Sequence, residues 1–363
     1  MTWVRTSIVL IAVLVLTVWV SGGPQRGGTA AAARKLSPAD ATASIVAATR
    51  ALTSALDEGA RSKVQFPFEG PQKARWSNLP SGIFQRQGLR MGDLTPAQRA
   101  AVMNLLQTTL SPDGFRKVTE IMRGDEVLRT TGGGAPGGRG GGRGRGGPGS
   151  GGLIFGEDEY YLAFVGTPST TSPWMLQFGG HHLAINLTLA GSEASMTPSL
   201  PAAQPASYTF EGKEIRPLGK ENDKAFALIN ALDAAAQRQA ILSSRVADLV
   251  LGPGQDGRVI QPEGIRATAL SSAQQTMLLD IVREWAGIMT DSFAEPRMAE
   301  IRGNLPETYF AWSGSTTNGS AAYFRIQGPT LVIEYAPQQG SVDHIHTIYR
   351  DPTNDYGAKL LAK

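Results

Sequence analysis

The stretch that decides the fold is YFAWSGSTTNGSAAYFRIQGPTLVIEYAPQQGSVDHIHTIYR, residues 309–350. It holds four short runs rich in aromatic and β-branched residues, at 309–312, 322–327, 330–335 and 342–350, with Asn-Gly, Gly-Pro and Gly-Ser turns between them. Strands joined by such short turns pair with their neighbours along the chain. The pattern therefore predicts an antiparallel β-meander near the carboxyl end.

Upstream of the meander, helices and strands occur in separate groups. Ser37-Pro38, Thr95-Pro96 and Ser111-Pro112 each place a capping side chain before a proline, which is typical of a helix start. This segregation favours an α+β fold, with a helical N-terminal part packed on an antiparallel sheet. No internal repeat is expected. The predicted helices lie at 37–56, at 95–109, from 111 onward, at 220–243, at 272–289 and near Met298, and the predicted strands at 160–165 and 174–189.

The first 33 residues have the pattern of an export signal. Arg5 precedes an apolar run from Ile8 to Val20, and small residues follow at 29–33. The run is shorter than the roughly 20 residues that span a bilayer, so we expect a cleaved signal peptide at 1–33. The mature chain, 34–363, is then a single domain exported to the periplasm or the extracellular space, without a stable membrane span. A retained membrane anchor is the alternative.

Composition excludes several classes of protein. The chain has no cysteine, so disulfides and thiolate metal sites are absent. Its net charge of +3 comes largely from the signal region and from three arginines in a glycine-rich stretch, which we interpret as a disordered insertion at 131–152. The folded body is close to neutral, and we therefore expect no nucleic-acid partner.

Histidine is scarce, and the four present fall into two tight groups, His181-His182 and His344-Ile345-His346. Residues two apart on a strand face the same side, so His344 and His346 present two imidazoles from one surface, as zinc or copper requires. His181 and His182 are neighbours and point to opposite faces of a regular strand. Gly179-Gly180 before them marks a possible bulge, and the less apolar surroundings of His182 favour it as the ligand.

Three further residues are candidates for the chemistry. If the last two strands pair so that Glu334 lies opposite His344, its carboxylate faces the histidines and serves as a fourth ligand or general base. Arg350, with Asp351 or Asp355, is a candidate for binding an anionic group of a substrate or for orienting a ligating imidazole through its other nitrogen. A structural ion pair in a polar turn is the alternative for Arg350 and Asp351, and structural hydrogen bonding is the alternative for the histidines.

Six stretches of the mature chain carry a resemblance: Pro173-Trp174, 177–183 (QFGGHHL), 216–219 (RPLG), 310–312 (FAW), 323–329 (YFRIQGP) and 344–357. In these stretches the chain resembles an uncharacterised exported family known as domain of unknown function 3500. The resemblance covers most of the mature chain and implies a single family domain, but no settled activity.

These patterns together predict an exported protein whose histidine cluster holds a divalent metal ion, zinc or copper, and acts on a small molecule by hydrolysis or oxidation. Whether it is an enzyme stays open. The alternative is a non-catalytic envelope protein that binds a small ligand, with structural histidines. The sequence does not indicate an oligomeric state.

Overall fold

A computed structural model of the chain describes residues 36–132 and 152–362. The predicted signal peptide and nearly all of the predicted Gly/Arg insertion lie outside these residues. Within the described ranges, no helix combines the length and the apolar character needed to cross a bilayer.

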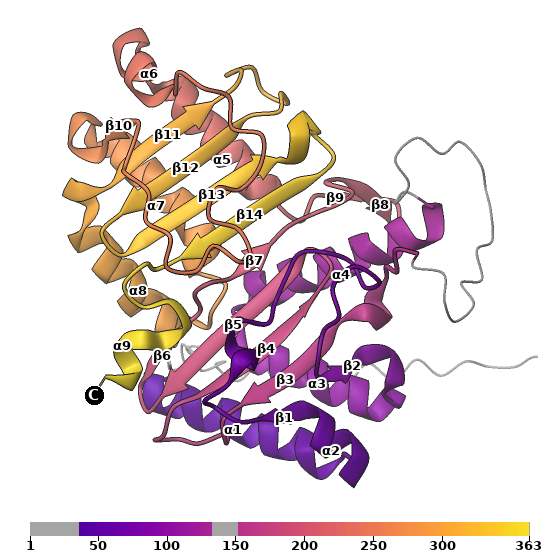
Figure 1. Cartoon of the computed structure of the whole chain (residues 1–363). Helices are drawn as coiled ribbons and strands as arrows, with labels where there is room; N and C mark the ends of the chain where they lie inside the picture. The colour runs from indigo at the N-terminus through magenta and orange to yellow at the C-terminus, as the bar shows by residue number, and fades with distance from the viewer. Residues whose placement is uncertain (1–35, 133–151, 363) are drawn as a thin grey trace, which may run out of the picture. The chain divides into compact units, whose positions relative to one another are not determined.

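The first half of the fold is a helical layer on a mixed sheet, here called the first sheet (Figure 1). Its strands run in the order β1-β3-β4-β5-β6, with β2 also on β3 and β7 also on β5, and only the β1–β3 contact is parallel. The elements are α1 (Pro38–Ser54), α2 (Glu58–Val64), β1 (Gln65–Phe66), β2 (Leu89–Arg90), α3 (Pro96–Thr109), α4 (Pro112–Thr131), β3 (Tyr161–Val165), β4 (Trp174–Gly180), β5 (Leu183–Ala190), β6 (Glu193–Ser195) and β7 (Leu200–Pro201).

The second half repeats a helical layer on a sheet and confirms the predicted meander. The second sheet has the order β10-β11-β12-β13-β14, antiparallel throughout. A small hairpin of β8 (Tyr208–Phe210) and β9 (Lys213–Ile215) precedes it. The elements are α5 (Gly219–Ala231), α6 (Ala234–Ala240), β10 (Ile265–Arg266), α7 (Ser272–Ala286), α8 (Asp291–Gly303), β11 (Tyr309–Ser313), β12 (Tyr323–Gly328), β13 (Leu331–Pro337), β14 (Ile345–Arg350) and the short α9 (Ala358–Leu361).

Each sheet buries one apolar face under helices. In the first half, Leu176 and Ile185 belong to the same core cluster as Ile45 of α1 and Leu105 of α3. In the second half, the strands share a core with α5 and α7, as the aromatic contact between Phe226 and Trp312 shows. This arrangement confirms the α+β prediction.

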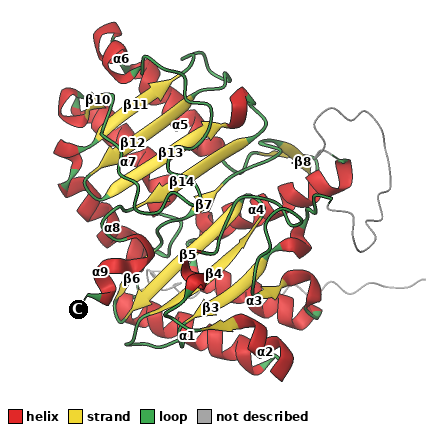
Figure 2. Ribbon diagram, viewed as in Figure 1, coloured by secondary structure: helices red, strands yellow, loops and turns green. Residues whose placement is uncertain are grey.

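The opposite face of each sheet is polar, buried and covered by an extended loop. Over the first sheet, Gln72 donates to Gln177 of β4. Over the second, the backbone amides of Val250 and Leu251 donate to Glu334 of β13. Figure 2 shows loop segments crossing the second sheet on the side away from α5 and α7.

Two sequence expectations about elements are wrong. The single strand expected at 174–189 is the β4–β5 hairpin, because Gly180 pairs with Leu183 and leaves His181 and His182 in the turn. The helix expected at 220–243 breaks between α5 and α6, because Asp233 adopts an extended conformation and caps the second helix through Ala235 and Ala236.

The expectation of no internal repeat is also wrong. Residues 88–98 (GLRMGDLTPAQ) and 264–274 (GIRATALSSAQ) each form a short strand, a 3₁₀ turn and the start of a capped helix. The pairing repeats as well: Leu89 is opposite Leu162, and Ile265 is opposite Phe310. The halves are therefore two copies of one architecture with few identical residues.

The two copies join through their last strands. Ser199 beside β7 pairs with Tyr349, and Ala203 pairs with Ile345, both antiparallel. Because β7 also pairs with β5, the segment around β7 links the first sheet to β14. Antiparallel pairing of two equivalent edge strands relates the copies by an approximate two-fold axis.

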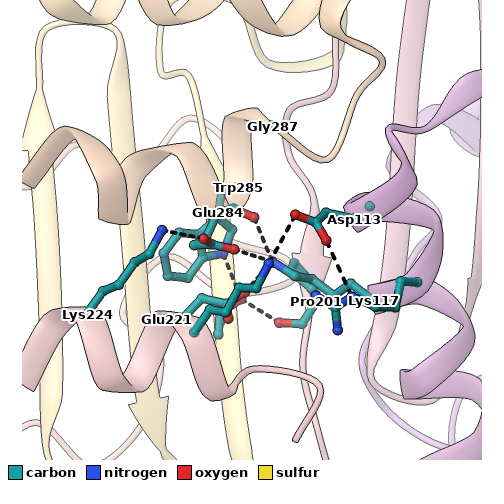
Figure 3. Close-up of polar contacts among 12 residues, drawn as sticks. Asp113, Lys117, Pro201, Glu221, Lys224, Glu284, Trp285 and Gly287 are labelled. Atoms are coloured by element: carbon teal, nitrogen blue, oxygen red, sulfur yellow. Dashed lines mark hydrogen bonds and ion pairs between the residues drawn. The ribbon is translucent and has the colours of Figure 1, made fainter.

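A buried cluster of charges also ties the copies together (Figure 3). Lys117 of α4 is 3% exposed and forms an ion pair with Glu221 of α5, which is fully buried. Lys117 also donates to the carbonyl of Glu284 on α7, at 2.7 Å. Its ammonium group therefore holds α4 of the first copy against two helices of the second.

Candidate metal centre

Three of the four histidines of the chain converge. His182, His344 and His346 each offer a ring nitrogen, and these nitrogens all lie within 4.8 Å of one another. The Nε2 atoms of His182 and His344 are 2.9 Å apart. His182 and His346 are buried, and His344 is half-buried.

The tight β4–β5 hairpin delivers His182. A Cβ atom at Gly180 would lie 2.8 Å from the ring of the buried Tyr160, and one at Gly179 would lie 2.5 Å from the carbonyl oxygen of Leu183. Only glycine fits this close approach. The turn that follows holds His182 at a φ of 61°, a left-handed conformation uncommon for a non-glycine residue.

The strand β14 and the residue before it position the imidazoles of His346 and His344. His346 lies on β14 and His344 immediately precedes it. The pairing of Ala203 with Ile345 fixes the start of β14 beside the segment that follows β7. The cluster thus draws one histidine from the first copy and two from the second.

Two neighbours orient the cluster. The Asp248 carboxylate accepts a hydrogen bond from Nδ1 of His346 at 2.8 Å, which leaves Nε2 of that ring as the unprotonated acceptor nitrogen. Asn78 Nδ2 lies 3.2 Å from this Nε2, and the Asn78 carbonyl accepts from the His182 amide at 3.4 Å. Burial acts to raise the pKa of Asp248, but His346, the Leu249 amide and His344 together lower the pKa below its ordinary value.

Two imidazoles of the cluster, those of His182 and His344, are held neutral. Burial, reinforced by the adjacent imidazoles, lowers the pKa of His182 well below its ordinary value. The same causes lower the pKa of His344 to about 3. A neutral imidazole is the form that binds a metal ion.

His181 lies next to the cluster without joining the convergent group. Its ring stacks on that of His182 with centroids 3.6 Å apart, and its Nδ1 donates to the buried carboxylate of Asp125 at 2.6 Å. This contact turns its Nδ1 toward α4.

Glu334 does not lie opposite His344, so the expected register is wrong. Glu334 pairs with Ile348, while His346 pairs with Ala336 and His344 precedes the strand. The Glu334 carboxylate accepts hydrogen bonds from the backbone amides of Val250 and Leu251 and from the Tyr323 hydroxyl. The catalytic role expected for Glu334 stays a prediction.

Arg350 and Asp351 form ion pairs around the end of β14. Arg350 contacts Asp256 at 2.9 Å and Asp355 at 2.8 Å, and it also donates to two backbone carbonyls of the covering loop. Asp351 contacts Arg297 at 3.0 Å and accepts from Thr353. These contacts are those of the structural alternative, and a catalytic role for either residue stays a prediction.

Sequence reasoning missed Asn78, Asp125 and Asp248. Each lies far along the chain from the histidine it contacts, in a loop or helix without a recognisable motif. The only available signal was the duplicated architecture, which places the segments containing Asn78 and Asp248 in corresponding covering loops.

The fold and the site define a class of α+β protein: two fused copies of a helix-covered sheet, with a histidine cluster where the copies meet. A family model described as "Protein of unknown function (DUF3500)" matches residues 38–358, and the chain belongs to this family. Searches of curated proteins and of solved structures each found no match.

Proposed function

We propose that His182, His344 and His346 bind one divalent metal ion, zinc or copper, through ring nitrogens. The observation that carries this proposal is the convergence of three nitrogens within 4.8 Å in a region where the imidazoles are buried. Tetrahedral zinc with ordinary Zn–N bonds separates its ligand nitrogens by about 3.3 Å. The 2.9 Å between His182 and His344 is close to this separation. The remaining separations, which do not exceed 4.8 Å, adjust toward it when the ion binds.

The surroundings support a metal centre further. Asp248 and His346 form the carboxylate–histidine pair that fixes the ring and raises the basicity of a ligating nitrogen. Three protein ligands leave a fourth position for water or substrate, as in catalytic zinc sites. The proposed protein is an exported enzyme that acts on a small molecule, by hydrolysis with zinc or by oxidation with copper.

The first test is elemental analysis of untagged protein purified from the exported fraction, with the variants His344→Ala and His346→Ala. His181→Ala is the matched control, because this ring stacks on the cluster but is hydrogen-bonded to Asp125. We expect one equivalent of zinc or copper in the wild type and in His181→Ala, and none in the other two. Folded protein that takes up no metal after reconstitution contradicts the proposal.

One observation favours the alternative of a non-catalytic binding protein. The imidazoles already contact one another, Asn78 and Asp248, as structural histidines do. In that case the cluster only joins the two copies. The His344→Ala variant is then destabilised to the same extent whether or not metal is added.

A further inference from the structure

A second polar site lies on the loop-covered face of the first sheet. It is a cavity of about 30 Å³, room for roughly two water molecules. Among the described residues that line it are two arginines, Arg75 and Arg86, and no carboxylate. The polar lining comes from Gln72, Arg75, Ser77, Arg86, Gln87, Tyr161, Gln177 and Asn186.

Arg86 is the central feature of this cavity. Its Nη2 donates to the carbonyls of Ser77, Leu79 and Gly180, each at 2.7 Å. Its Nη1 is buried and has no hydrogen-bond partner among the described residues. Burial lowers the pKa of Arg86 to about 10, even though acidic groups such as Asp125 act at longer range to raise it.

A buried guanidinium normally has an ionic partner, since removing a charge from water is costly. None of the described carboxylates forms an ion pair with Arg86. Glu159 pairs with Arg90 and Asp125 pairs with His181. The groups that Nη2 of Arg86 contacts are neutral carbonyls. Arg75 adds a second positive charge to the same lining and is itself exposed. The cavity is therefore electropositive.

Gln72 also lines this cavity and carries a buried acceptor without a partner in the described part of the chain. It is 5% exposed, its Nε2 donates to Gln177, and its Oε1 has no partner within the described ranges. The orientation of Gln177 is fixed because its own Nε2 donates to the carbonyl of Lys73 and to Asn186. A ligand that satisfies both orphan atoms must offer an acceptor to Arg86 and a donor to Gln72.

The second copy of the architecture shows what occupies the equivalent place there. Gln177 pairs across the strands with Asn186, and Arg325 pairs with Glu334 at the matching position. Arg325 has a protein carboxylate as partner, Glu263, at 2.7 Å.

Glu263 immediately precedes Gly264, and the residue that precedes the equivalent Gly88 is Gln87, which lines the cavity. In the second copy Glu263 neutralises Arg325, whereas both equivalent residues of the first copy, Gln87 and Gln177, are neutral. The positive charge of the first copy comes instead from Arg86 and Arg75, with no carboxylate among the described residues of the cavity lining.

We propose that this cavity binds the carboxylate of a small organic acid that also carries a hydroxyl or ammonium donor next to it. The carboxylate accepts from Arg86 and Arg75, and the donor is bound by Gln72. The space, about that of two water molecules, limits the buried part of the ligand to the carboxylate end of a very small acid.

The cavity shares a wall with the histidine cluster. Ser77 and Leu79, whose carbonyls bind Arg86, flank Asn78, which contacts His346. Gly180, the third acceptor, precedes the histidine turn. A bound acid is therefore placed beside the proposed metal centre, but its binding does not require the metal.

The test is isothermal titration of the metal-free protein with glycolate, and with acetamide as an uncharged analogue. We expect one saturable glycolate site with a dissociation constant in the millimolar range, as a ligand of a few atoms allows. Acetamide should not bind. Gln72→Met and Arg75→Met should each weaken glycolate binding by about tenfold.

The controls separate this inference from general charge effects and from the metal centre. Arg50→Met removes an exposed arginine of α1 and should bind glycolate as the wild type does. His344→Ala/His346→Ala should also bind normally, even if the metal proposal fails. Arg86→Met should abolish binding where circular dichroism shows that it folds.

Three results would overturn the inference. They are the absence of saturable binding, equal binding of acetamide, and unchanged binding in both Gln72→Met and Arg75→Met.

Discussion

Gln98 and Gln274 occupy equivalent positions in the two copies of the architecture. Each closes a capping box at the start of its helix, and each donates its side-chain amide to a carbonyl 43 residues earlier, Ala55 for Gln98 and Ala231 for Gln274. Both hydrogen bonds span the same number of residues and join equivalent helices, so the repeat extends to single side-chain contacts.

From this equivalence we expect Gln98→Ala and Gln274→Ala to lower the free energy of unfolding by similar amounts, about 1 kcal/mol each. The two sites share no hydrogen-bond partner, so the double variant should show the sum of the two effects. Urea denaturation of the three variants measures this. A large difference between the single variants would contradict the equivalence.

The second prediction concerns the histidine turn. Gly180→Ala places a methyl group against the buried ring of Tyr160, and we expect a loss of about 1–3 kcal/mol in stability together with weaker metal binding. Gly303→Ala is the control, because a Cβ at this position on α8 meets nothing within 4 Å. Thermal unfolding and metal titration of both variants provide the measurement.

The third prediction concerns the ion pair between the copies. Lys117→Met leaves the buried carboxylate of Glu221 without its cation and should cost about 3–5 kcal/mol. Lys117→Met/Glu221→Leu removes both charges and should recover a substantial part of that loss. If the double variant is less stable than Lys117→Met, the pair contributes more than its desolvation costs, contrary to our expectation.

The fourth prediction concerns pH. Burial raises the pKa of Glu221 above its ordinary value of 4.5, although Lys117 acts to lower it. A raised folded-state pKa gives stability that is present below the unfolded-state pKa and is lost as the pH rises through the folded-state value. The stability of the wild type minus that of Glu221→Gln should therefore decrease as the pH rises from about 4.5.

Chemical denaturation of the two proteins across the acidic to neutral range checks this sign. Glu58→Gln, exposed on α2, controls for the substitution itself. A difference that increases with pH would show that the Lys117 ammonium outweighs burial.

The fifth prediction concerns the orientation of His346. Asp248→Asn keeps the shape of the side chain but removes the carboxylate that accepts from Nδ1. We expect metal affinity to fall by about 10–100-fold while the protein remains folded. Competition with a chromophoric chelator measures the affinity, and Asp343→Asn, on the neighbouring loop, is the control. Unchanged metal affinity in Asp248→Asn would contradict the proposal that the Asp248 carboxylate orients His346 as a metal ligand.

The sequence by itself determined those features that depend on neighbouring residues. Ser37, Thr95 and Ser111 mark helix starts because a cap is a contact within one turn. The strands of 309–350 pair as a meander because short turns leave few alternatives. The spacing of His344 and His346 indicated a shared surface for the same local reason.

Only the tertiary structure decided the features that depend on distant segments. The register of β13 on β14 places Glu334 opposite Ile348, and a slip of one residue would have moved every side chain to the other face. The pairing of Ala203 with Ile345 and the contact of Asp248 with His346 join segments that no local pattern relates. The repeat was hidden for a similar reason: equivalent positions conserve apolar character, caps and turns, which many different residues provide.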